Sequence, residues 1–131
     1  MEENSKDKQS HLLDPVQIQM LLEAGAEDSL ELFSELIGLY EEESQEKLEE
    51  IRKHYADQNF DSLGRAAHAL AGSSANIGGS QVWMKAKEVE NLCKAGNGDE
   101  AGLLVEHLQA TYDETIAALH AFISQLESSS D

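Results

Sequence analysis

Residues 61–79 have the sequence DSLGRAAHALAGSSANIGG, and the spacing of their apolar side chains decides the fold. Steps of four and three residues separate Leu63, Ala67, Leu70, Ser74 and Ile77. Because an α-helix completes a turn about every 3.6 residues, these side chains share one face of a helix. The Gly78-Gly79 pair that follows marks the end of this helix.

The same helical period continues on both sides of this stretch. Asp14-Pro15 is typical of a helix N-terminus, because Asp caps free amide groups and Pro fits the first turn, and it begins a short helix that ends near Gly25. Longer amphipathic segments follow over about 27–55, over 80–94 and from about 99 to 127. No segment shows the period of two that a half-buried strand requires. The sequence therefore predicts an all-α fold, an antiparallel four-helix bundle with a short additional N-terminal helix.

The length of 131 residues and the hydrophobic fraction of 40% indicate a single compact domain. We expect this domain to cover residues 12–127, between disordered polar tails at 1–11 and 128–131. The N-terminus lacks the pattern of a signal peptide, and no apolar run approaches the roughly 20 residues of a membrane-spanning helix. The single cysteine, Cys93, cannot form an internal disulfide. These features predict a cytoplasmic protein.

The net charge of the chain restricts its partners. Nine Lys and Arg residues against 26 Asp and Glu residues give a net charge of −17. Nucleic acids and anionic membranes repel such a protein, so we expect neither as a partner. We also expect the chain to be a monomer. The stretch from Asp61 to Lys87 is an exception, since Arg65, Lys85 and Lys87 outnumber Asp61 there.

Most residue types that carry chemistry occur without the partners that the chemistry needs. The five histidines, at 11, 54, 68, 107 and 120, have no second His or Cys three or four residues away, so we predict no metal site. Gly96-Asn-Gly98 follows a helical segment and lacks a Lys, which indicates a turn and not a phosphate loop. Ser73 and Ser74 lack the Gly-x-Ser-x-Gly pattern of a serine nucleophile. The acidic run 41–50 is typical of a solvated helix face.

His68 differs from the other candidates because it lies away from the apolar seam. At about 100° per residue it stands about 140° from the centre of the seam, so its side chain should face solvent. The outward side that it shares carries Asp61, Arg65, Gly72, Ala75, Asn76 and Gly79, with Gly64 and Ala71 on its flank. Most of these residues are small, and Gly72, one turn beyond His68, leaves the ring open to a second protein. The alternative is an ordinary surface histidine beside a tightly packed helix that needs glycine.

The stretch from His68 to Gly78 resembles the signature of the histidine-containing phosphotransfer (HPt) domain family. That signature is His, any residue, Leu, Lys, Gly, Ser, Ser, three residues and Gly. The matching positions are His68, Leu70, Gly72, Ser73, Ser74 and Gly78, and the resemblance extends over about residues 14–127, through Ala66-Ala67, Val89-Glu90 and Lys94-Ala-Gly96. One position departs from the family, because Ala71 stands where the family commonly has Lys.

The resemblance implies a function for the exposed histidine. In this family that histidine, here His68, accepts a phosphoryl group, and the partners are receiver domains, here of a hybrid sensor histidine kinase and of a response regulator. The chain itself would need no cofactor, since Mg²⁺ belongs to the acidic pocket of the receiver. The chemistry agrees with a bare histidine, because neutral imidazole is a competent nucleophile without an activating base.

Two functions stay open at this point. A phosphorelay shuttle would transfer the group through His68, whereas a non-transferring adaptor, which the missing Lys favours, would bind a receiver by the same face. A kinase that phosphorylates itself would need an ATP-binding domain, for which this chain has no room. For the shuttle we expect Arg65, one turn before His68, to replace part of the charge of the absent Lys. The alternative is an ordinary solvated arginine.

Overall fold

The computed structural model describes residues 12–129, and the predicted tail residues 1–11 and 130–131 lie outside the described residues. No strand occurs in this part of the chain. Its helices are α2 (Pro15–Ala24), α3 (Ser29–Ala56), α4 (Phe60–Ile77), α5 (Ser80–Lys94) and α6 (Gly102–Ser129), with 3-10 turns η1 (Ala26–Asp28) before α3 and η2 (Gly98–Ala101) before α6. The all-α prediction is confirmed.

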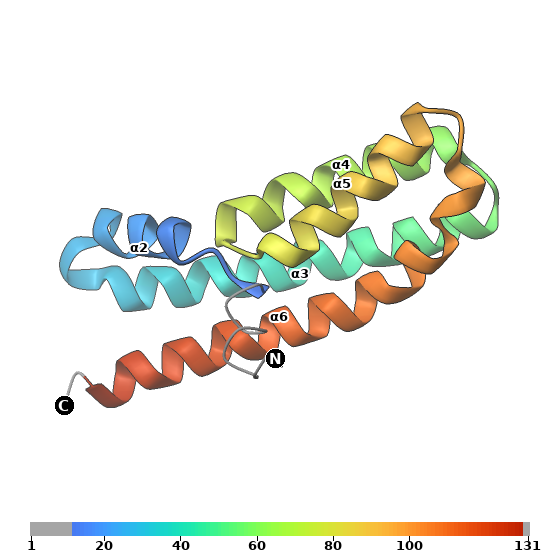
Figure 1. Ribbon diagram of the computed structural model, residues 1–131. Coiled ribbons are helices and arrows are strands. Elements are labelled where there is room, and N and C mark those ends of the chain that lie inside the picture. Colours follow the sequence, from blue (N-terminus) through green and yellow to red (C-terminus); the bar gives the residue numbers. More distant parts are fainter. Residues whose placement is uncertain (1–11, 130–131) are drawn as a thin grey trace, which may run out of the picture.

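The long helices α3 and α6 lie side by side, and the hairpin of α4 and α5 covers one half of this pair (Figure 1). The α3–α4 and α5–α6 connections lie at the same end, so neighbouring helices run antiparallel. α2 packs against α3 and α4, beside the N-terminal part of α3. The observed architecture is therefore the predicted four-helix bundle with an additional N-terminal helix. None of the described helices is long and apolar enough to cross a membrane.

The ends of several helices follow from capping residues in the sequence. The carboxylate of Asp14 accepts hydrogen bonds from the backbone amides of Val16 and Gln17, at 3.1 and 3.3 Å, and α2 begins beside it. Asn59 caps α4 through a backbone amide of its first turn, at 3.3 Å. α5 occupies the predicted range. α6 continues through residues 128 and 129, which were predicted as part of a tail and belong to a helix instead.

A tight turn at Gly78 and Gly79 joins α4 to α5. Gly78 has a φ of 86°, a left-handed conformation that side chains rarely adopt, and a Cβ there would approach Cγ1 of Ile18 to 2.8 Å. The amide of Gly79 donates to the carbonyl of Ser74 at 2.8 Å and closes the last turn of α4. The turn therefore depends on glycine at position 78.

This short turn sets the pairing between the two helices of the hairpin. Residues at equal or nearly equal distances before and after Gly79 lie next to each other. His68 and Glu90, eleven positions on either side of Gly79, are in contact. Ala75 and Trp83, four positions on either side, line one pocket. The turn thus brings chosen positions of α5 next to the exposed histidine of α4.

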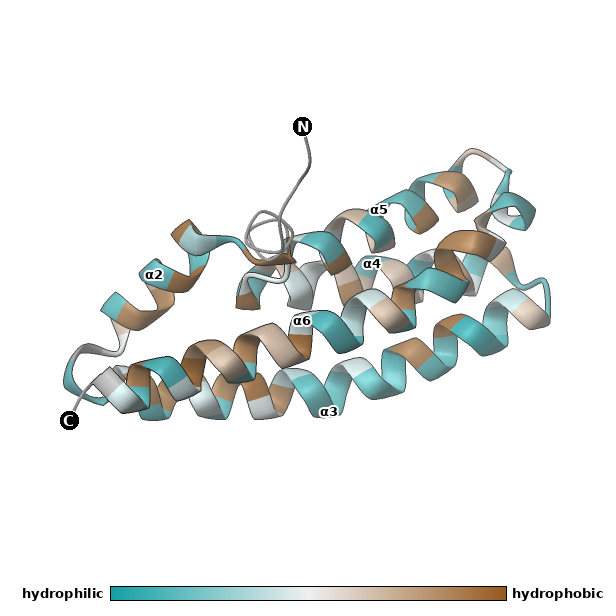
Figure 2. Cartoon of the chain, turned by 60° about the horizontal axis from the view of Figure 1, so that its bottom comes forward, coloured by the Kyte–Doolittle hydropathy of each residue, from teal (hydrophilic) through white to brown (hydrophobic). Residues whose placement is uncertain are grey.

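The core runs along the centre of the bundle, and Figure 2 shows hydrophobic and hydrophilic segments alternating along the helices. All five members of the seam predicted in residues 61–79 are buried. Their buried neighbours include Phe33, Ile37, Leu48 and Ile51 of α3, Val82, Ala86 and Val89 of α5, and Leu108, Tyr112 and Leu119 of α6. In a buried polar layer the hydroxyls of Tyr40 and Ser74 lie 2.7 Å apart, and this hydrogen bond contributes about 1 kcal/mol to holding α4 against α3.

Candidate functional site

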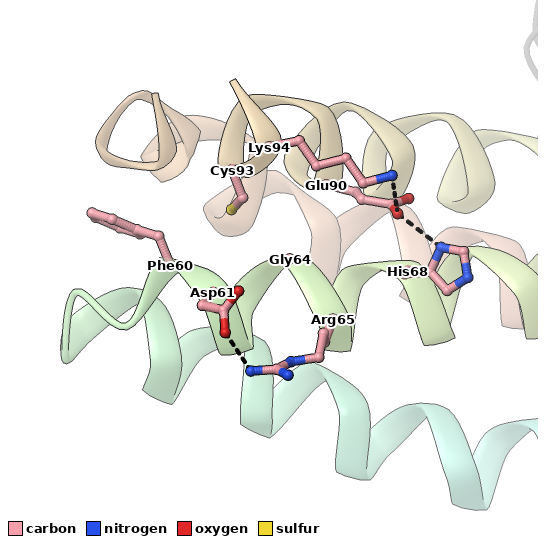
Figure 3. Close-up of a pocket in the computed structure, with 8 residues that line it drawn as sticks. All are labelled: Phe60, Asp61, Gly64, Arg65, His68, Glu90, Cys93 and Lys94. Atoms are coloured by element: carbon pink, nitrogen blue, oxygen red, sulfur yellow. Dashed lines mark hydrogen bonds and ion pairs between the residues drawn. The ribbon is translucent and has the colours of Figure 1, made fainter. Parts of the chain in front are cut away.

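His68 lies in the middle of α4, and its side chain is 69% exposed. Its Nδ1 atom is 2.8 Å from Oε2 of Glu90 on α5. Figure 3 shows the second ring nitrogen, Nε2, on the side of the ring away from Glu90. One ring nitrogen is thus held by the protein, and the other is left for a reaction partner.

Glu90 is a buried carboxylate with three hydrogen-bonding partners. Its side chain is 4% exposed, and Lys87 and Lys94 each donate to it at 3.1 Å, to Oε1 and Oε2 respectively. Burial alone would raise the pKa of Glu90, but the hydrogen bonds from Lys87, Lys94 and His68 outweigh it and lower the pKa to about 2. An ionised carboxylate only accepts hydrogen bonds, so Nδ1 of His68 carries the proton in this pair. The neutral ring then has its lone pair on Nε2, which is the nucleophilic atom.

A groove of about 330 Å³ runs beside His68 between α4 and α5 (Figure 3). It is lined by Phe60, Asp61, Gly64, Arg65, His68, Glu90, Cys93 and Lys94. Gly64 lets the two helices approach, since a Cβ there would lie 3.2 Å from Cβ of Cys93. Burial raises the pKa of the Cys93 thiol and disfavours the reactive thiolate. His68 is therefore the better nucleophile of the groove.

Most of the predicted face lies on the exposed side of α4. Arg65, Gly72, Ala75 and Asn76 are exposed, as His68 is. A Cβ on Gly72 would meet no other atom within 4 Å, so the space above this position is open. Gly64, predicted on the flank of the face, is half-buried against α5.

Two residues of the predicted face are buried: Gly79, whose predicted place on the outward side is wrong, and Ala71, which was predicted on its flank. Ala71 is 2% exposed, and it follows Gly64 and His68, which contact α5, at helical spacing on the same edge of α4. Gly79 follows the last residue of α4, so the helical wheel does not describe its direction. A Cβ on Gly79 would approach Cγ2 of Thr115 on α6 to 3.2 Å, which places the residue inside the bundle.

Arg65, the predicted cation of the site, is engaged one turn away from His68. Its guanidinium donates to the carboxylate of Asp61, and both side chains are exposed. In Figure 3 this ion pair is part of the lining of the groove, apart from the hydrogen bond between His68 and Glu90.

The sequence reasoning missed the roles of Glu90, Lys87 and Lys94. They lie on α5, far from His68 along the chain, and nothing local connects them to it. The signal that could have found them is the short turn, because His68 and Glu90 are equally distant from Gly79. Lys87 and Lys94 are then the neighbours of Glu90 at helical spacings of three and four residues.

The other described histidines lie outside this site. His54 is on α3, and His107 and His120 are on α6. Nε2 of His120 lies 2.9 Å from a carboxylate oxygen of Glu41, a hydrogen bond between α6 and α3. Among residues 12–129, no group of three or more His, Cys, Asp or Glu side chains is arranged to hold a metal ion. His11 lies outside the described residues.

Charge is distributed unevenly over the chain. Residues 60–95, which form α4, α5 and their turn, contain four Lys or Arg and three Asp or Glu residues, a net charge of +1. The rest of the chain therefore carries −18. An anionic reactant meets far less repulsion at the α4–α5 hairpin than elsewhere on the molecule.

The fold and the site define a class of protein, a helical bundle that presents one oriented, exposed imidazole on its surface. The family model described as Hpt domain matches residues 35–128. This match covers more than half of the chain, and the chain belongs to the Hpt domain family. Membership gives it a phosphotransfer role in a phosphorelay. The resemblance inferred from residues 68–78 is confirmed.

Solved structures of histidine-containing phosphotransfer proteins share the fold. Protein B from Pseudomonas aeruginosa is 19% identical with a TM-score of 0.74, over 87% of this chain and 96% of that one. A protein from Medicago truncatula is 22% identical with a TM-score of 0.76, over 95% of this chain and 85% of that one. One from maize is 24% identical with a TM-score of 0.74, over 93% of this chain and 89% of that one. At these identities the similarity establishes the fold alone. A search of curated proteins gives no match.

Proposed function

We propose that this protein carries a phosphoryl group on Nε2 of His68 between the aspartates of two receiver domains. One receiver belongs to a hybrid sensor histidine kinase and the other to a response regulator. The observation that supports this proposal is the geometry of His68, whose Nδ1 is bound to buried Glu90 while Nε2 lies on the other side of an exposed ring.

The transfer follows from this geometry. The Nε2 lone pair of His68 attacks the phosphorus of the aspartyl phosphate, the new N–P bond forms, and the P–O bond breaks with its electron pair leaving on the aspartate. The Nδ1 proton stays in its hydrogen bond to Glu90, which stabilises the positive ring that results. Transfer to the second receiver reverses these steps. The receiver brings the Mg²⁺ that stabilises the travelling group, and this chain brings the oriented nucleophile.

The docking face extends from His68 toward the end of α4 and onto α2. Gly72, Ala75 and Asn76 continue the exposed side of α4, and the side-chain amide of Gln17 on α2 donates to the carbonyl of Asn76 at 3.0 Å. The large hydrophobic side chains that α2 exposes are Val16 and Met20, 68% and 58% exposed. A specific interface covers about 800 Å² on each partner, more than the surroundings of one imidazole supply. We therefore place α2 within the contact.

The second candidate is an adaptor that binds a receiver by the same face without accepting the group. The observation in its favour is Ala71, which stands where the family motif has Lys. The two candidates differ in one measurable event, the transfer itself.

The test is incubation with a receiver that carries radiolabelled phosphate. We expect the label to appear on this chain, to be lost in acid and to survive in base, as a phosphoramidate does. His68→Gln should keep the helical spectrum and the melting temperature and accept no label. The matched variants His11→Gln, His54→Gln, His107→Gln and His120→Gln should be labelled like the wild type. Full labelling of His68→Gln would overturn the assignment.

Binding is measured separately with Trp83. It is the only tryptophan of the chain, is 41% exposed and lines a pocket with Ala75 on the proposed docking face. Its fluorescence should change on titration with a receiver, for the wild type and for His68→Gln. A shuttle shows both binding and labelling, whereas an adaptor shows binding without labelling of the wild type.

A further inference from the structure

The cation that the family motif places three residues after the histidine is absent here, because that position is Ala71. Ala71 is 2% exposed and shares the edge of α4 on which Gly64 and His68 contact α5. Ala71 and Lys87 are each eight positions from Gly79, so from the pairing observed for His68 and Glu90 we infer that Lys87 lies opposite Ala71. A lysine of α5 thus stands across the helix pair from the place of the missing lysine of α4.

We propose that Lys87 supplies from α5 the cation that balances the phosphoryl group on His68. This inference rests on the proposed function. Lys87 donates to Oε1 of Glu90 at 3.1 Å, while Oε2 of the same carboxylate binds Nδ1 of His68 at 2.8 Å. The ammonium group and the imidazole are therefore held by two oxygens of one side chain. The side chain of Lys87 is 37% exposed, so it is free to reach toward an added group.

Position along the helices favours Lys87 over the other cations near the site. The ammonium of Lys94 binds Oε2 of Glu90, the same oxygen that binds Nδ1 of His68, so it lies on the Nδ1 side of the ring, and Figure 3 shows Nε2 pointing away from it. Arg65 is bonded to Asp61. Lys87 lies on the side of Glu90 toward Gly72, one turn beyond His68, where the space next to the helix is open.

The proposed movement breaks no covalent bond. When Nε2 of His68 is phosphorylated, the ammonium of Lys87 moves from Oε1 of Glu90 to a phosphoryl oxygen, or bridges the two. Glu90 keeps its bonds to Lys94 and to the protonated Nδ1, so its buried charge remains paired. A hydrogen bond between two charged groups at a partly exposed position changes an equilibrium or a lifetime by roughly two- to fivefold.

The experiment compares phosphorylated variants after removal of the receiver, at low salt. Lys87→Gln should shorten the lifetime of the phosphohistidine about two- to fivefold, and adding Ala71→Lys should restore it. In the ³¹P spectrum, loss of the cation should also raise the pKa of the phosphoryl group. Lys85→Gln, which removes the same charge from the same helix, should leave both quantities unchanged.

Lys94→Gln separates contact with the phosphoryl group from an effect through Glu90. If Lys94→Gln and Lys87→Gln shorten the lifetime equally, the effect passes through Glu90 and the inference is wrong. An unchanged lifetime and an unchanged ³¹P titration in Lys87→Gln also overturn the inference. The proposed function stands in that case, because the wild type is still labelled on His68. Failure of the wild type to accept any label is a different outcome, which overturns the proposed function.

Discussion

Nδ1 of His68 and Oε2 of Glu90 lie 2.8 Å apart and join an exposed ring on α4 to a buried carboxylate on α5. The hydrogen bond restricts rotation of the ring and determines which nitrogen carries the proton. Lys87 and Lys94 pair with the buried carboxylate of Glu90, so it stays ionised and its charge is not left unpaired. The nucleophile is therefore prepared by residues of both helices of the hairpin.

Glu90→Gln should slow phosphoryl transfer to His68 without unfolding the protein. The amide keeps a hydrogen-bond acceptor but removes the charge that stabilises the positive ring. The loss of one charge-assisted hydrogen bond, about 1.5 kcal/mol, corresponds to a roughly tenfold lower rate. The rate of labelling by a phosphorylated receiver measures it. Glu88→Gln, the same change at an exposed position of α5, is the control. Equal rates in the two variants would exclude a role for Glu90 in transfer.

Glu90 also predicts how stability depends on pH. Burial opposes its ionisation, but its bonds to Lys87, Lys94 and His68 lower the pKa from 4.5 to about 2. A group whose pKa falls on folding stabilises the fold while it is ionised, so the contribution is complete above about pH 5 and is lost as the pH falls toward 2. Because the lysines are partly exposed to solvent, the contribution of Glu90 to the free energy of unfolding stays below about 3 kcal/mol.

Urea unfolding of the wild type and of Glu90→Gln at pH 7 and pH 3 measures this contribution. The wild type should be more stable at pH 7, and the difference between the two proteins should shrink at pH 3. Glu88→Gln should differ from the wild type by the same small amount at both values. A difference for Glu90→Gln that stays constant from pH 7 to pH 3 would contradict the assigned pKa.

Gly72→Gln should raise stability and block transfer at the same time. Glycine inside a helix costs about 1 kcal/mol relative to good helix formers, and a side chain at Gly72 meets no atom of the protein. The same side chain would stand one turn from His68, in the path of the receiver. Gly38→Gln is a matched control, since Gly38 is an open glycine on α3. Thermal unfolding should show a gain for both variants, and only Gly72→Gln should fail to be labelled. Normal labelling of Gly72→Gln would show that the path lies elsewhere.

The sequence predicted those features that depend on one helix at a time. The seam on α4, the exposure of His68 and the bounds of α5 all follow from helical period and turn residues. The burial of Ala71, predicted on the flank of the exposed face, was not predicted, because a helical wheel gives the direction of a side chain but not the neighbouring helix that covers it.

The missed parts of the site depend on the contact between two helices. Glu90 has lysines at helical spacing, a pattern that is also typical of a solvated surface, so its burial could not be predicted from composition. Arg65 has both Asp61 and His68 within one turn, and the ionised carboxylate binds it more strongly than a neutral ring does. Which of two neighbours a side chain binds therefore depends on their charge as well as on their spacing.

Val16→Glu should weaken binding of the receiver and leave the fold intact. Val16 is the second residue of α2 and is 68% exposed, so a carboxylate there is solvated and is favourable near a helix N-terminus. If the receiver covers α2, the variant loses the burial of one valine, about 1.5 kcal/mol, which corresponds to a roughly tenfold higher Kd. Titration followed by Trp83 fluorescence measures this Kd.

Leu103→Glu is the matched control for the contact with α2. Leu103 is the second residue of α6 and is 67% exposed, so the change in charge, polarity and helix position is the same. It lies at the end of the bundle where α5 connects to α6, whereas α2 lies toward the other end (Figure 1). The control should bind the receiver with the Kd of the wild type. If both variants weaken binding equally, added negative charge and not the surface of α2 is responsible; if neither does, the receiver docks on the α4–α5 hairpin alone.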